Sequence, residues 1–203
     1  MHEMQKTRPW AILAAGAAIQ VLTGLPAAWG VFQRPVMEEY GLSEQGAGYA
    51  FGVLIAAFGV GCVLGGFLQD SRGPRCAALW GTALLCGGFF AAAMLPGGSA
   101  VSFFLAFSIP AGLGTASLYP SIQSCAQKWY AGRKGLATGV IGGAVGLSGA
   151  FLTVFVRTAV SGFGIVQGIR GAFWALGAVT LPVCLAGSLL LQDPPESRQS
   201  QQG

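Results

Sequence analysis

The chain has 203 residues, of which 53% are hydrophobic and only 9% are charged, and its mean hydropathy is +0.62. A soluble domain usually carries about 25% charged residues, so this composition excludes that class. The formal net charge of +4 comes from bases scattered at the ends of apolar runs, and no basic stripe of the kind that binds nucleic acid is present. The 33 glycines have no G-X-Y period, which indicates close packing of helices in lipid and not collagen.

Six apolar runs follow one another along the chain. They cover about residues 10–32, 46–68, 76–95, 100–126, 135–156 and 171–191. At ~1.5 Å of rise per residue, a helix of this length crosses the ~30 Å hydrocarbon core of a bilayer. The runs are continuous and lack the alternation of barrel strands. The sequence therefore predicts an all-α integral membrane protein, with six transmembrane helices in one domain over residues 10–192.

The loops between these runs differ in their content of Lys and Arg. The N-terminus, the second loop, the fourth loop and the tail hold eight bases, whereas the loops of the opposite side hold three. The eight are Lys6, Arg8, Arg72, Arg75, Lys128, Arg133, Lys134 and Arg198, and the three are Arg34, Arg157 and Arg170. By the positive-inside rule, the side with more Lys and Arg faces the cytoplasm, so both termini are expected there. The membrane is expected to be the plasma or inner membrane of the cell.

The polar ends of the chain add no catalytic domain. Residues 1–9 read as a short cytoplasmic N-terminus, and residues 193–203, rich in Pro, Gln and Ser, read as a disordered cytoplasmic tail. The one histidine, His2, lies in the N-terminus, and no nucleophile is paired with a base. Five cysteines within or beside the apolar runs read as small packing residues. We therefore expect no enzyme activity, no cofactor and no metal site.

A short charged loop, Gly65 to Arg75, separates the second and third runs. It resembles the signature loop between the second and third helices of the major facilitator superfamily of transporters, which reads roughly G-x-x-x-D-R-x-G-R-R. Gly66, Asp70, Gly73 and Arg75 match, whereas Ser71 stands at the family's usual first arginine, Arg72 follows one place later, and Pro74 replaces a base. The resemblance implies one half of a twelve-helix transporter, built as a 3+3 helix repeat.

The segment before the fifth run points to one family within this superfamily. Lys128, Trp129, Tyr130, Arg133, Lys134, Gly135, Leu136, Ala137 and Gly139 match a K-W-[FY]-x-x-[RK]-[RK]-G-L-A-x-G pattern. This pattern is similar to that of the oxalate/formate antiporter family, which is related to the monocarboxylate transporters. The first run adds Trp29-Gly30-Val31-Phe32 and Arg34-Pro35, and it departs at Ala27, where members often carry an aromatic residue facing the substrate. The two loops are expected to act in gating, through Gly66, Asp70, Arg72, Gly73, Arg75, Lys128, Arg133 and Lys134.

Polar residues within the apolar runs are the candidate substrate contacts. Thr115, Tyr119 and Gln123 recur every four residues, so they share one face of the fourth helix, beside Pro120. Gln20 and Thr23 lie about one turn apart on the first helix. The resemblance implies that the first and fourth helices line a central cavity, and it adds Trp29 to the candidates. Hydrogen bonds between neighbouring helices are the alternative role for these residues.

The fifth run carries overlapping rows of small residues, Gly135, Gly139 and Gly143 and also Gly142 and Gly146. Such rows mark a helix surface that another helix approaches closely, either within the six-helix set or in a partner. Because halves of these transporters are parallel repeats, a second copy of the chain or another half-subunit is the expected partner. The second helix would then meet the partner's fifth helix, and Asp70 would approach the region from Arg133 to Leu136, where bases and the helix dipole favour a carboxylate.

These features together predict a carrier of small organic anions, either mono- or dicarboxylates, that works by alternating access. No Asp, Glu, Lys or Arg lies near the middle of any run, which argues against proton coupling through a buried acid in this chain. The same absence of charge favours the alternative, a fragment without transport activity or a structural membrane subunit. A pore for neutral solutes is the third candidate.

Overall fold

The computed structural model describes residues 9–97, 99–160 and 168–191, and it consists of helices joined by short turns. The predicted tail at 193–203 and the first eight residues lie outside the described residues, as do Lys6, Arg8 and Arg198. Within the described ranges there is no strand, so the protein is all-α.

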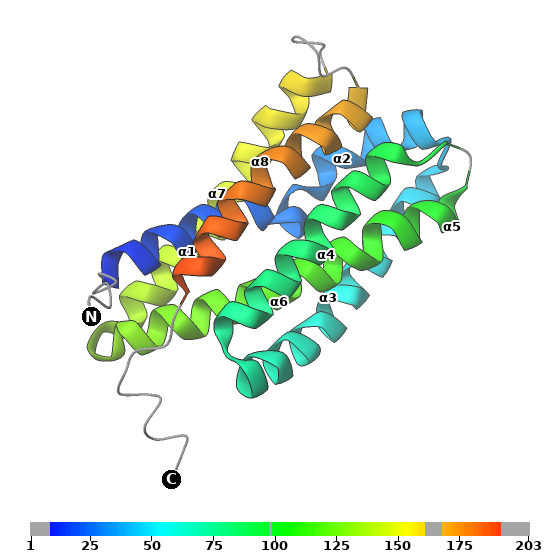
Figure 1. The fold of residues 1–203 in the computed structure, drawn as a ribbon. Helices are drawn as coiled ribbons and strands as arrows, with labels where there is room; N and C mark the ends of the chain where they lie inside the picture. Colours follow the sequence, from blue (N-terminus) through cyan, green and yellow to red (C-terminus); the bar gives the residue numbers. More distant parts are fainter. Residues whose placement is uncertain (1–8, 98, 161–167, 192–203) are drawn as a thin grey trace.

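Among the described residues, six spans are long and apolar enough to cross a membrane. In chain order they are α1 Pro9–Thr23 with α2 Leu25–Tyr40, α3 Glu44–Arg72, α4 Pro74–Met94, α5 Ala100–Phe103 with the π-helix Phe104–Ser108 and α6 Ile109–Trp129, the 3-10 turn Ala131–Arg133 with α7 Lys134–Val160, and α8 Gly168–Leu190. They form a bundle in which the long helices run side by side (Figure 1).

Two of the spans are not uniform α-helices, and a nearby proline or glycine accounts for each irregularity. The first span is interrupted at Gly24, two residues before Pro26, and then runs eight residues beyond the predicted end at 32, to Tyr40. The fourth span contains the π-helix, which ends two residues before Pro110. Proline has no N–H, so the carbonyl four residues earlier loses its normal donor and the ladder shifts or breaks.

Glycines bring α6 against both α3 and α4 at backbone distance. A Cβ atom on Gly114 would lie 2.5 Å from the backbone nitrogen of Leu85, and one on Gly81 would lie 2.7 Å from the Gly114 carbonyl oxygen. On the other side of α6, a Cβ on Gly112 would lie 2.5 Å from the Leu54 carbonyl oxygen. No side chain fits at these positions, so the three helices share one closely packed core.

One residue joins α3 to α4. Gly73 has a φ of 87°, in the region that favours glycine, and Pro74 starts α4 at a position where its missing N–H costs nothing. The turn is therefore shorter than the predicted loop, because α3 continues as a helix through Asp70 to Arg72.

At the opposite end of the bundle, polar contacts tie α2 to α4 and α8. The Tyr40 hydroxyl donates a 2.6 Å hydrogen bond to the Ala92 carbonyl oxygen. The Arg170 guanidinium lies 5.7 Å from the centre of the Tyr40 ring and forms a 2.8 Å ion pair with Glu39. Beneath them, aromatic rings of α2, α4, the π-helix and α8 fill the core.

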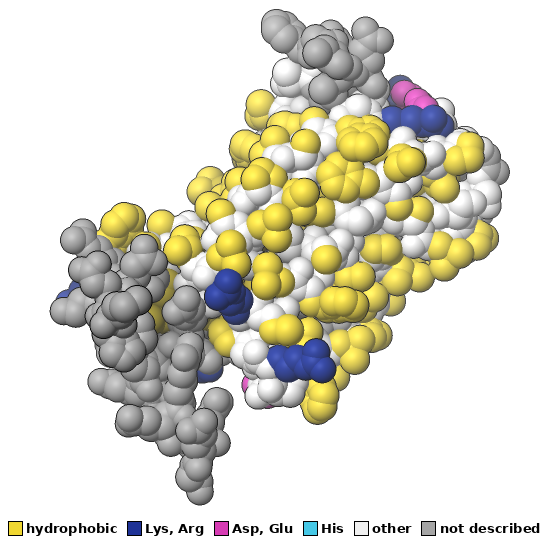
Figure 2. Space-filling model, in the orientation of Figure 1, with side chains coloured by type: hydrophobic (Ala, Val, Ile, Leu, Met, Phe, Trp, Pro, Cys, Tyr) yellow, Lys and Arg dark blue, Asp and Glu magenta, His cyan; other side chains and the backbone are white. Residues whose placement is uncertain are grey.

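The surface has the pattern of a membrane protein. On the face drawn in Figure 2, hydrophobic side chains cover the middle of the helices, and charged side chains lie toward the two ends. Among the described residues, α3 and α7 are the least buried of the six spans.

We predict that Gly114→Ala lowers the stability of the fold by about 1–3 kcal/mol, because the added methyl group forces the α4 and α6 backbones apart. Thermal unfolding in detergent measures the change. Gly87→Ala is the matched control, since a Cβ there meets nothing within 4 Å, and its midpoint should stay at or slightly above that of the wild type. Equal midpoints for both variants would contradict the close packing.

Candidate functional site

The interruption of the first span places two polar side chains at the interior of the bundle. Gln20 and Thr23 end α1, and both are buried. The Thr23 hydroxyl donates a 3.1 Å hydrogen bond to the Gln20 Oε1 atom. This contact directs the amide nitrogen of Gln20 away from Thr23, and that nitrogen has no hydrogen-bond partner among the described residues. A buried amide without a partner is costly, so a group that accepts its hydrogen would be bound favourably.

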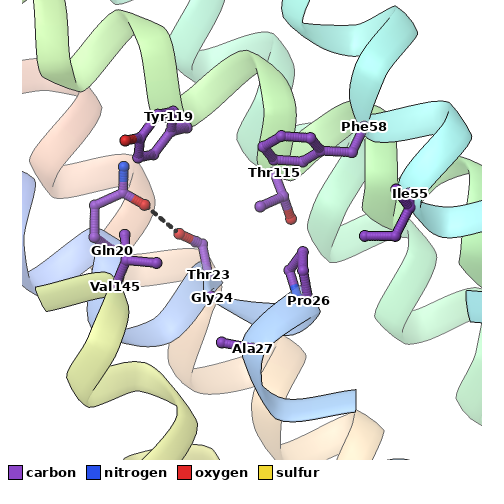
Figure 3. Close-up of a pocket in the computed structure, with 10 residues that line it drawn as sticks. All are labelled: Gln20, Thr23, Gly24, Pro26, Ala27, Ile55, Phe58, Thr115, Tyr119 and Val145. Atoms are coloured by element: carbon purple, nitrogen blue, oxygen red, sulfur yellow. Dashed lines mark hydrogen bonds between the residues drawn. The ribbon is translucent and has the colours of Figure 1, made fainter. Parts of the chain in front are cut away.

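The opposing wall comes from α6, whose small residues allow it to lie close to its neighbours. Thr115 and Tyr119 project from one face of this helix, as their spacing of four residues predicts. The Thr115 hydroxyl is buried, and the part of the chain that the structure describes offers it no hydrogen-bond partner. In Figure 3 the amide nitrogen of Gln20 is turned toward the phenol of Tyr119.

These side chains line a cavity of about 390 Å³, which lies in the range of small-molecule sites. Its walls come from α1, α2, α3, α6 and α7, and the residues are Gln20, Thr23, Gly24, Pro26, Ala27, Ile55, Phe58, Thr115, Tyr119 and Val145 (Figure 3). Carboxylate and ammonium side chains are absent from this lining. The cavity thus offers a few neutral N–H and O–H donors among walls that are mostly carbon, a combination that suits a small molecule with oxygen acceptors.

Ser148 on α7 holds the broken span in place. Its hydroxyl donates to the Val145 carbonyl oxygen at 2.6 Å and lies 3.3 Å from the Gly24 carbonyl oxygen. A Cβ atom on Gly24 would collide with the Ser148 hydroxyl, so only glycine allows this approach. The cavity therefore depends on the contact between the first span and α7.

The structure brings together four of the six predicted substrate contacts, namely Gln20, Thr23, Thr115 and Tyr119. Gln123 lies one turn beyond Tyr119 on α6, and its buried Oε1 atom accepts no hydrogen bond within the described ranges. Trp29 is not part of the lining: its ring is buried and stacks on Phe51 at 5.9 Å and on Phe107 at 6.3 Å.

The lining residues that α3 and α7 contribute were not predicted; they are Ile55 and Phe58 on α3 and Val145 on α7. Each lies in a run that is apolar on all sides, so no periodicity distinguishes the residues of the cavity from those that face lipid. Only the packing of the helices separates the two sets.

The predicted gating residues lie at one end of the bundle, away from the cavity. Gly66, Asp70, Arg72, Gly73 and Arg75 surround the α3–α4 turn, and Lys128, Arg133 and Lys134 surround the α6–α7 turn. Asp70 is exposed and makes no ion pair within the described part of the chain. A 3.0 Å hydrogen bond from Gln127 Nε2 to the Thr138 hydroxyl closes the second turn.

The family model of the Major Facilitator Superfamily matches residues 8–203. An uncharacterized 38 kDa protein of Thermoproteus tenax is 31% identical over 191 residues, which cover 92% of this chain and 48% of that protein. The oxalate:formate antiporter of Oxalobacter formigenes is 23% identical, with 78% of this chain and 36% of that protein covered. Monocarboxylate transporter 9 of Mus musculus is 27% identical, with 89% and 35% covered.

Comparison with solved structures shows the same helical fold. The inward-open xylose transporter XylE of E. coli superimposes with a TM-score of 0.73 at 15% identity, covering 96% of this chain and 50% of that one. The chain thus spans about a third to a half of the length of the relatives that it matches.

We predict that the cavity is open to water, and cysteine labelling tests this. Ile55→Cys, in the lining, should react with a hydrophilic maleimide about tenfold faster than the native thiols of the wild type, because a thiol reacts as its thiolate and ionises only in contact with water. Two controls should not react above the wild type: Leu54→Cys, which is fully buried, and Val63→Cys, which is exposed on the apolar surface. The same low rate in all three variants would contradict an aqueous cavity.

Proposed function

We propose that this chain, which belongs to the major facilitator superfamily and is a multi-pass membrane protein, transports small organic anions by alternating access. The observation that carries the proposal is the cavity at the break in the first span, with unpartnered Gln20 and Thr115 donors on its walls. Relatives named as an oxalate:formate antiporter and as a monocarboxylate transporter support mono- or dicarboxylates as substrates and exchange as the mode of transport.

Neutral donors suit a carboxylate that must be released again. The Gln20 amide and the Thr115 and Tyr119 hydroxyls can each donate a hydrogen bond to a carboxylate oxygen. Hydrogen bonds to a charged group contribute about 1.5–3 kcal/mol each, so two or three of them hold an anion without the tight binding of a buried ion pair. The apolar side of the cavity, Ile55 and Phe58, contacts the carbon part of the substrate.

A second set of six helices completes the transporter, either from another copy or from another half-subunit. The described residues do not enclose the cavity completely, so this chain surrounds a substrate only in part. Alternating access is then the rocking of the two halves about the substrate. With more Lys and Arg on one side of the spans, both termini lie in the cytoplasm and the spans lie in the cell membrane.

One observation favours a second candidate, a fragment or structural membrane subunit without transport activity. The lining contains no cation, whereas an anion such as oxalate carries two charges to be compensated. In the transport proposal the opposite wall supplies that compensation, and in the second candidate the anion is not bound.

Liposomes that contain only the purified chain distinguish the two candidates. We expect uptake of labelled formate, lactate or oxalate that is accelerated by unlabelled substrate inside, which is the sign of exchange. Gln20→Leu should raise the half-saturation concentration about tenfold or more by removing the buried donor. Gln33→Leu, on α2 and outside the cavity lining, is the control and should leave it unchanged. Absence of uptake by the dimeric chain would favour the second candidate, and uptake without trans-acceleration would indicate a pore.

A further inference from the structure

The hydrogen-bond donors of the cavity are few. Gln20 and Thr115 are only 1% and 4% exposed, and neither the Gln20 amide nitrogen nor the Thr115 hydroxyl has a partner within the described part of the chain. The Thr23 hydroxyl is already used, since it donates to Gln20. Tyr119 adds a phenol to the lining. A carboxylate has about four lone-pair sites on its two oxygens, so these donors suffice for one carboxylate and leave none for a second.

Carbon makes up the rest of the lining that the structure describes. The other lining residues have no polar side chain, and they are Gly24, Pro26, Ala27, Ile55, Phe58 and Val145. In Figure 3, Ile55 and Phe58 lie across the cavity from Gln20 and Tyr119. The far end of a dicarboxylate would therefore meet carbon and lose its hydration without replacement, which is costly. Even if it met Thr115, a single hydroxyl would fill one of its about four acceptor sites.

The cavity is also larger than the smallest acids need. Its volume is about 390 Å³. If each non-hydrogen atom is given the ~30 Å³ of a molecule in liquid water, the six of oxalate fill about half of the cavity and the three of formate about a quarter. Water in the remaining space would meet mostly carbon, whereas a retained water needs about two to four polar partners. A substrate that brings an apolar body displaces this water favourably.

We propose that this lining selects a monocarboxylate whose apolar body is about the size of a phenyl ring, and that formate, oxalate and longer dicarboxylates are poor ligands. The inference rests on the proposed transport function for the role of the site. An acid of this class, 3-phenylpropionate, has eleven non-hydrogen atoms and fills most of the cavity at the same ~30 Å³ per atom. Its carboxylate accepts from the cavity donors, and its ring contacts Ile55 and Phe58.

Ala27 determines how much space the apolar body has. It lines the cavity from α2, and its methyl group is exposed, so a larger side chain there would occupy the cavity. Contacts with α7 hold this part of the first span in place. The Ser148 hydroxyl lies 3.3 Å from the Gly24 carbonyl oxygen, and a Cβ atom on Gly149 would lie 3.5 Å from the Ala27 carbonyl oxygen. The small side chain at position 27 is therefore a determinant of substrate size.

Equilibrium binding of three acids to the purified chain in lipid nanodiscs tests the selection. We expect 3-phenylpropionate to bind at least tenfold more tightly than acetate, which has the carboxylate without the apolar body. It should also bind at least tenfold more tightly than adipate, which has a similar number of atoms but a second carboxylate. Equal affinities, tighter binding of adipate, or no binding of any of the three acids would overturn the proposal.

Variants of the lining connect this order of affinities to the cavity. Ala27→Phe fills the space of the apolar body, so the affinity for 3-phenylpropionate should fall at least tenfold while that for acetate changes less than twofold. Phe58→Ala, which removes the contact with the ring, should likewise weaken the binding of 3-phenylpropionate alone. Ala56→Phe is the matched control, because it adds the same side chain at an exposed position of α3 outside the lining, and both affinities should stay unchanged.

Retained binding of acetate shows that a variant is folded, and Phe58→Ala tests the proposal without adding any bulk. If neither Ala27→Phe nor Phe58→Ala changes the affinity for 3-phenylpropionate, the acid binds elsewhere and the proposal is wrong. The same is true if Ala56→Phe weakens its binding as much as Ala27→Phe does.

Binding is measured without flux, so the selection and the proposed transport function can fail separately. The expected order of affinities without uptake into liposomes leaves the selection in place and refutes transport. Uptake of oxalate or formate that an excess of 3-phenylpropionate does not inhibit supports transport and refutes the selection.

Discussion

The backbone contacts of α6 with α3 and α4 are the constraint on which the rest of the structure depends. In water, apolar side chains drive helices together, but in lipid that force is largely lost and van der Waals packing must hold the helices. Gly81, Gly112 and Gly114 allow this packing because they leave no side chain between the backbones. The contacts fix the rotation of α6, and that rotation turns Thr115 and Tyr119 toward the first span.

The first span, in contrast to α6, is interrupted near its centre. Gly24 and Pro26 interrupt the helix at the depth of the cavity, and Ser148 on α7 packs against the interruption. A break in a spanning helix is tolerated where neighbouring polar groups satisfy the backbone. Here it allows Gln20 and Thr23 to end α1 as a hydrogen-bonded pair. The rigid α6 wall and the interrupted first span together produce a cavity with directed but neutral donors.

The glycines of the chain serve two purposes that look identical in the sequence. Some of them, such as Gly61 and Gly65, bring helices of this chain together, and others, such as Gly52 and Gly142, lie on an open face. The same division applies to the charges: Glu39 is paired with Arg170 inside the chain, whereas Asp70 is not paired in the described residues. Charged groups are thus paired within the chain at the Glu39–Arg170 end of the bundle. The open glycines and Asp70 have no such contacts among the described residues.

The sequence by itself determined the class of the protein, because hydrophobicity over about 20 residues is a property of composition and does not depend on tertiary contacts. Its loop motifs were sufficient to indicate the superfamily. The spacing of Thr115 and Tyr119 predicted a shared face, and the polarity of Gln20 and Thr23 made them candidates for the same cavity. Only the tertiary structure decided that Trp29 packs in the aromatic core, that Ile55 and Val145 line the cavity, and which glycine rows are open. In a helix that is apolar on every side, the sequence carries no signal for which face meets protein, cavity or lipid, so the neighbouring helices make that distinction.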